Sequence, residues 1–64
     1  MKRDQFIRQL RKEAKARGLR VEIDRKLGKG AHYRARAGDK VSTIKSGDLS
    51  PLYMEIVRKQ LGLG

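Results

Sequence analysis

Hydrophobic residues near the start of the chain recur at helical spacing. They fall at positions i, i+1, i+4 and i+8, which places them on one stripe of a helix. These residues are Phe6, Ile7, Leu10 and Ala14. Asp4 suits a first turn, where the helix dipole favours a carboxylate, and Gly18 is typical of the position just beyond a helix. The pattern therefore predicts a helix over residues 3–16 with one apolar face.

The middle of the chain alternates apolar and polar residues with a period of two, which is typical of half-buried strands. Leu19, Val21 and Ile23 mark the first such segment, and β-branched residues mark the third. Turns that contain glycine separate the segments, because glycine permits the backbone angles of a tight reversal. The pattern predicts three strands, over residues 19–26, 31–37 and 40–44, with turns at 27–30 and 38–39.

The second predicted strand separates small side chains from basic ones. One face holds Tyr33 and three alanines, and we expect it to meet the helices. The opposite face is made of His32, Arg34 and Arg36, and we expect it to meet solvent or substrate.

A helical signature returns after a loop at residues 45–49. Ser50 is a good N-cap, and Pro51 suits the first position of a helix. The helix is predicted to continue to about Leu61, where Gly62 ends it. Its expected inward residues are Leu52, Tyr53, Ile56, Val57 and Leu61.

The order helix, three strands, helix predicts an α+β domain in which a three-stranded antiparallel sheet carries both helices on one face. The double-stranded-RNA-binding fold has this α-β-β-β-α order, although order alone does not establish function. We expect one domain over residues 1–64, and a chain of this size buries only ~60% of its unfolded surface. Cysteine is absent, which excludes disulfides and fits a reducing cytoplasm. We expect neither a signal peptide nor a membrane span.

Positive charge dominates the composition and narrows the class of partner. Seventeen lysines and arginines stand against seven acids, which gives a formal net charge of +10. A polyanion is therefore the expected partner, either RNA, DNA or an acidic protein. One histidine and scattered acids do not form a usual set of zinc or iron ligands, so we expect no metal site and no cofactor.

His32 is the single histidine, and it follows a turn that contains Gly28 and Gly30. RNA supplies its own nucleophile, the 2′-hydroxyl, so a nuclease needs only proton transfer and stabilisation of the charge on the phosphorane. A histidine is suited to the proton transfer, because an ordinary imidazole titrates near pH ~6.5. The neighbouring cations, Lys29, Arg34 and Arg36, are suited to stabilising the charge. On composition alone, a surface histidine that has no functional role is the more common case.

The motif around this histidine occurs together with a particular set of neighbours. The sequence Gly-Lys-Gly-Ala-His at 28–32 precedes a basic strand, a Gly-Asp turn and a closing helix that ends Val-Arg-Lys-Gln-Leu-Gly-Leu at 57–63. Over nearly the whole chain this arrangement resembles the HicA family of toxin mRNA interferases. Family members often have Gly-Ser-His or Gly-Ser-His-His at the turn, whereas this chain has Ala31 for the serine and Tyr33 for the second histidine. The segment 44–47 also lacks the proline that is usual there.

The resemblance implies a cytoplasmic bacterial or archaeal toxin that cleaves mRNA without a cofactor or metal and is neutralised by a cognate HicB-type antitoxin. The family's catalytic histidine corresponds to His32 and its turn glycine to Gly30. Strand faces and charge add four expected RNA contacts, which are Lys29, Arg34, Arg36 and Lys45.

Two other interpretations of the residues stay open. The first is a non-catalytic RNA- or DNA-binding module of the same fold, which needs the charge but not His32. The second is a small interaction protein whose basic surface docks an acidic partner.

Overall fold

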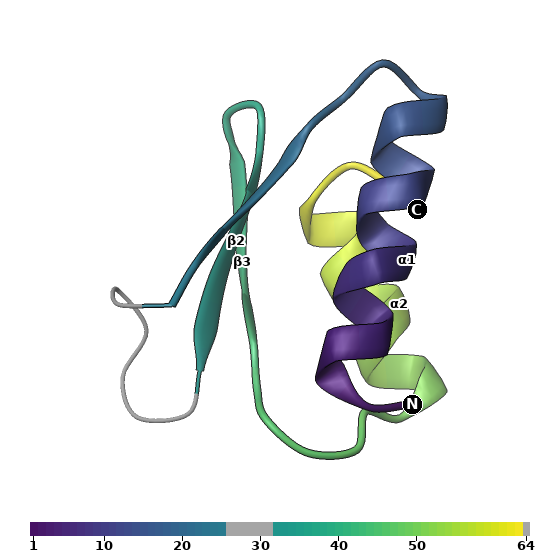
Figure 1. Ribbon diagram of the computed structural model, residues 1–64, viewed down its shortest axis with the longest axis vertical. Helices are drawn as coiled ribbons and strands as arrows, with labels where there is room; N and C mark the ends of the chain where they lie inside the picture. The colour runs from purple at the N-terminus through teal and green to yellow at the C-terminus, as the bar shows by residue number, and fades with distance from the viewer. Residues whose placement is uncertain (26–31, 64) are drawn as a thin grey trace.

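The computed structural model describes residues 1–25 and 32–63 of the chain, and Figure 1 shows their arrangement. The elements in chain order are α1 (Arg3–Ala16), β1 (Val21–Asp24), β2 (Tyr33–Ala37), β3 (Lys40–Ile44) and α2 (Pro51–Gln60). The three strands form one antiparallel sheet in the order β1-β2-β3. Both helices lie on the same side of this sheet (Figure 1). The α-β-β-β-α architecture that the sequence pattern predicts is therefore confirmed.

The first strand is shorter than its alternation predicts. The chain leaves α1 through Gly18, whose φ of 72° turns the backbone back on itself. The amide of Leu19 then donates to the carbonyl of Ala14 at 2.7 Å, so Leu19 closes the helix rather than opening the strand. Pairing starts at Val21. The predicted turn at 27–30 and the first residue of the predicted second strand lie outside the described residues.

The central strand β2 divides the molecule into a covered face and an open face. Ala35 and Ala37 are buried beneath the helices, while Arg34 and Arg36 are exposed on the opposite side. This division agrees with the prediction from alternation. Small side chains on β2 let the larger residues of both helices fill the space over the sheet, among them Phe6 and Leu10, which are fully buried.

The inward face of α2 agrees with the predicted one only in part. Leu52 and Ile56, expected in the core, are 73% and 46% exposed. Val57 and Leu61 are buried as predicted, and Tyr53 is half-buried. Met54, which the pattern does not single out, is buried as well. The residues that follow α2 pack on the side of the helix that carries Met54 and Val57. After Gly62 turns the chain, Leu63 packs into the core, and its amide donates to the carbonyl of Arg58 at 2.7 Å.

A network centred on Arg58 joins the two helices. Its guanidinium donates to both carboxylate oxygens of Glu13 on α1, at 3.1–3.3 Å, and to Gln9 at 3.2 Å. It also donates to Glu55 on its own helix at 3.3 Å. The same group lies 5.3 Å from the ring centroid of Phe6, so the pair covers one edge of the core.

We expect Arg58→Ala to lower the free energy of unfolding by about 1–3 kcal/mol. The variant removes several charge-assisted hydrogen bonds between α1 and α2 as well as the packing of the side chain stem. Glu55→Ala is the matched control, because Glu55 is 57% exposed and its contact is a surface pair worth at most about 0.5 kcal/mol. Urea denaturation followed by circular dichroism measures both values. Equal losses for the two variants would contradict the role given to the contact between helices.

Candidate functional site

His32 lies directly before β2, is exposed, and stands at a place where several segments meet. The next residue, Tyr33, has its ring 3.6 Å from the guanidinium carbon of Arg3 on α1 and 5.5 Å from that of Arg25, which follows β1. The register of β2 against β3 places Lys45 across from His32, one position beyond the last pair. We call these five residues the His32 corner.

The backbone of Lys45 is held by the first turn of α2. Its amide donates to the hydroxyl of Tyr53 at 3.1 Å, and this hydroxyl donates to the carbonyl of Thr43 at 3.0 Å. Tyr53 is itself fixed, because its amide donates to the side chain of the N-cap Ser50 at 3.2 Å. The Lys45 ammonium lies 4.9 Å from the centroid of the Tyr53 ring. The two tyrosines thus hold cations at one end of the sheet.

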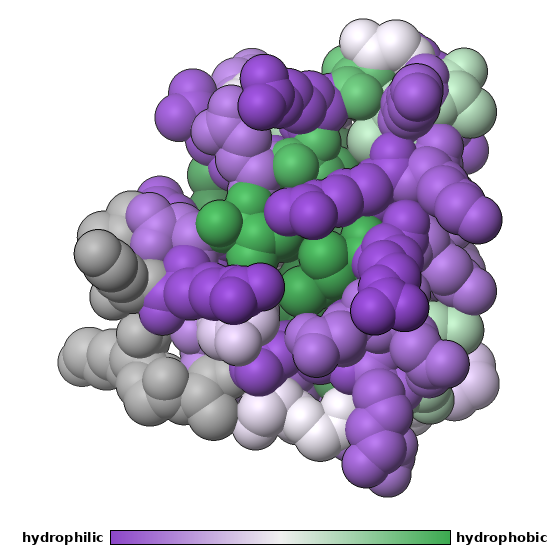
Figure 2. Space-filling model, viewed as in Figure 1, coloured by the Kyte–Doolittle hydropathy of each residue, from purple (hydrophilic) through white to green (hydrophobic). Residues whose placement is uncertain are grey.

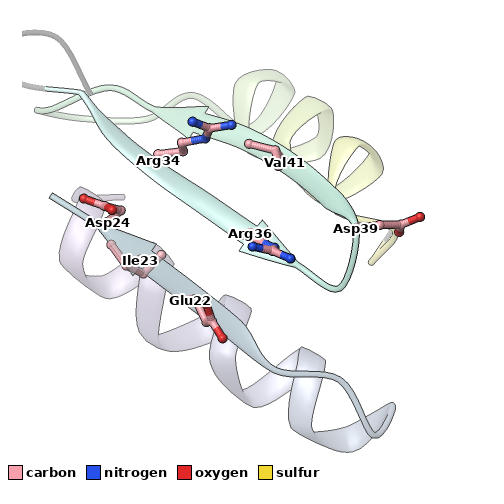
Figure 3. A pocket seen from close by; sticks show the side chains of 7 residues that line it. All are labelled: Glu22, Ile23, Asp24, Arg34, Arg36, Asp39 and Val41. Carbon is pink, nitrogen blue, oxygen red and sulfur yellow. The ribbon is translucent and has the colours of Figure 1, made fainter. Parts of the chain in front are cut away.

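The open face of the sheet carries acids as well as the two predicted arginines. Arg34 pairs across the sheet with Asp24, and Arg36 pairs with Glu22. Figure 3 shows these side chains around a hollow of about 570 Å³. Its lining consists of Glu22, Ile23, Asp24, Arg34, Arg36, Asp39 and Val41. Three carboxylates and two guanidinium groups therefore line this surface, which has no excess of positive charge.

The structure brings only one of the two strand arginines near His32. Arg34 is two residues further along β2. Arg36 is four residues away, about 13 Å along an extended chain. Its Nε donates to the carbonyl of Gly38 at 2.9 Å, which turns the side chain toward the β2–β3 turn. Arg34, but not Arg36, therefore lies near His32.

The remaining predicted contacts, Lys29 and Gly30, lie outside the described residues. Conversely, the structure adds Arg3 and Arg25, which the sequence patterns do not single out. Their contact with Tyr33 depends on how α1 and β1 pack against β2. The one sequence signal is an aromatic residue directly after the single histidine.

Among residues 1–25 and 32–63, no group of three or more histidine, cysteine or acidic side chains is arranged to hold a metal ion. Within the same ranges, no helix has the length and apolar character needed to cross a membrane.

No protein-family profile, curated protein or solved structure matches the chain. The geometry of the His32 corner, the charge distribution and the motif resemblance are therefore the support for a function.

We expect Tyr53→Phe to release the backbone at Lys45 while leaving the fold intact. The variant keeps the ring beneath the ammonium but removes the hydroxyl that bridges Thr43 and Lys45, a loss of about 0.5–1.5 kcal/mol. Amide hydrogen exchange by NMR should show faster exchange at Lys45 with little change at Ala35 in the sheet centre. Unchanged protection at Lys45 would mean that the tyrosine hydroxyl does not fix this segment.

Proposed function

We propose that this protein is a toxin of a type II toxin–antitoxin system, an endoribonuclease that cleaves mRNA without a metal ion and uses His32 for proton transfer. The observation that carries the proposal is the place of His32. It is exposed at the start of β2, at the end of the sheet where cations from α1, β1 and β3 gather. The resemblance of the glycine–histidine motif to the HicA family supports the same activity.

The proposed reaction uses a nucleophile that belongs to the RNA. The 2′-hydroxyl attacks the adjacent phosphorus, a bond forms between the 2′-oxygen and phosphorus, and the bond to the 5′-oxygen of the next nucleotide breaks. The proton leaves the 2′-oxygen and a proton reaches the 5′-oxygen. His32 carries out this proton transfer as a general acid–base.

Stabilising the negative charge that develops on the phosphorane requires cations close to His32. Arg34 follows it by two residues and shares its side of β2 by alternation, about 7 Å along the strand. Lys45 stands across from it in the β2–β3 register. Fixed cations at this position lower the energy of the phosphorane relative to the diester, which is how such groups accelerate the reaction.

The proposal includes a HicB-type antitoxin that covers the His32 corner. An exposed nuclease site would damage the mRNA of its own host. Acidic groups of the partner facing this basic end would speed association, because complementary potentials steer the encounter. The alternative, a non-catalytic RNA- or DNA-binding module, shares the fold and charge, and the histidine variant below separates the two.

We expect His32→Ala to lose RNA cleavage and toxicity while it keeps its fold and its affinity for RNA. Removal of a general acid–base should lower the cleavage rate by about 10²–10⁴-fold. The exposed side chain contributes little packing, and the cations remain. RNA decay, a growth assay and circular dichroism measure these effects, with Gln5→Ala on the exposed side of α1 as a matched control. A folded His32→Ala protein that cleaves at the wild-type rate would rule out this residue. A wild-type protein that binds RNA but never cleaves it would favour the binding module.

We expect RNA cleavage to continue in excess EDTA and to stop on a substrate whose 2′-hydroxyl groups are replaced by hydrogen. The first result is expected because His32 and the cations suffice for the proposed step, and the second because the nucleophile is missing. Gel analysis of labelled RNA and of its 2′-deoxy analogue measures both. Activity lost in EDTA, or equal cleavage of both substrates, would contradict the mechanism.

A further inference from the structure

A second hollow lies between α1 and β1. It has a volume of about 410 Å³. Its lining consists of Asp4, Ile7, Arg8, Arg11, Ile23 and Arg25. Ile7 is buried and Ile23 is half-buried, so the floor offers a small apolar surface at Ile23 inside a charged margin. Figure 2 shows hydrophobic surface between α1 and the sheet, bordered by long hydrophilic side chains. We call this hollow the α1–β1 groove.

The two hollows differ in the sign of their charge. The α1–β1 groove has three arginines and one aspartate, an excess of two positive charges. The hollow on the open face has two arginines and three acids, an excess of one negative charge. A polyanion is attracted by the first and repelled by the second, because a hollow lined by one sign of charge concentrates the field. The surface that carries the excess positive charge is therefore not the face with Arg34 and Arg36.

The α1–β1 groove leads to the His32 corner. Arg25 lines the groove, and its guanidinium carbon lies 5.5 Å from the ring centroid of Tyr33, the residue after His32. In the other direction, exposed cations continue along α1 at helical spacing. They are Arg8, Arg11, Lys12 and Lys15. This row spans about 10 Å of the helix axis. A strand held along it would reach Arg25, at the end of the sheet that carries His32.

The apolar patch at Ile23 favours a single strand over a duplex. An unpaired nucleobase can contact the exposed part of Ile23 while its phosphates meet the arginines, whereas the bases of a duplex are stacked inside the helix. We propose that single-stranded RNA lies in the α1–β1 groove, with its phosphates on Arg8, Arg11 and Arg25, and enters the His32 corner from this side. This proposal depends on the RNA substrate of the proposed function and names the surface that binds it.

Three double variants that each remove two charges test the proposal. Arg8→Gln/Arg11→Gln alters the α1–β1 groove, Arg34→Gln/Arg36→Gln alters the open face, and Arg17→Gln/Arg20→Gln alters exposed arginines outside both hollows. The probe is a fluorescent 12-nucleotide oligouridine, and anisotropy gives its affinity over a series of salt concentrations. Urea denaturation confirms that each variant folds.

We expect the groove variant to reduce the slope of log affinity against log salt by about 1.4, since each phosphate contact on a single strand contributes ~0.7. The open-face variant should reduce it by ~0.7 at most, because only Arg34 of that pair lies near His32. The Arg17/Arg20 variant should keep the wild-type slope. An unchanged slope in the groove variant, or the larger reduction in the open-face variant, would overturn the proposal while leaving RNA binding intact. Equal affinity for a duplex of the same length would also overturn it. Failure of the wild-type protein to bind any RNA would instead count against the proposed function.

Discussion

The packing of both helices over the alanines of β2 is the constraint on which the rest of the structure depends. Ala35 and Ala37 leave room above the central strand for the larger residues of α1 and α2. Inserting bulk there would force the helices apart, at a cost of about 1–3 kcal/mol for each overpacked site. Because side chains alternate along a strand, the same arrangement places Arg34 and Arg36 on the open side. The strand β2 therefore has a small apolar face toward the helices and a basic face on the opposite side.

The high net charge is distributed unevenly over the described residues. Arg58 is engaged by Glu13 and Glu55 at the contact between helices, and the arginines of β2 face acids on β1. Around the α1–β1 groove, by contrast, Arg8, Arg11 and Arg25 outnumber the one acid, Asp4. A total charge predicts the class of partner, but only the folded arrangement indicates which surface that partner meets.

The periodicity of the sequence predicts the first helix, the third strand and the overall α+β order, because each depends on local patterns. It fails where the chain end decides the packing. The spacing predicts the burial of Val57 and Leu61, but it also assigns Leu52 and Ile56 to the core, although both are exposed. Met54 is buried beside Val57, on the side from which Leu61 and Leu63 continue. In the candidate site, alternation places Arg34 and Arg36 on the open face. It does not predict the bond that turns Arg36 to Gly38, nor the approach of Arg3 and Arg25 to Tyr33, which join elements far apart in the sequence.

The two helices run in the same direction, and their N-termini lie at the same end of the molecule (Figure 1). The contacts of Arg3 with Tyr33 and of Tyr53 with Lys45 show that this is the end that carries His32. Aligned peptide dipoles give each helix N-terminus the equivalent of roughly half a positive charge. The backbone therefore adds a positive field to the basic side chains there. This part of the field is built into the topology, so it persists when individual lysines or arginines are replaced.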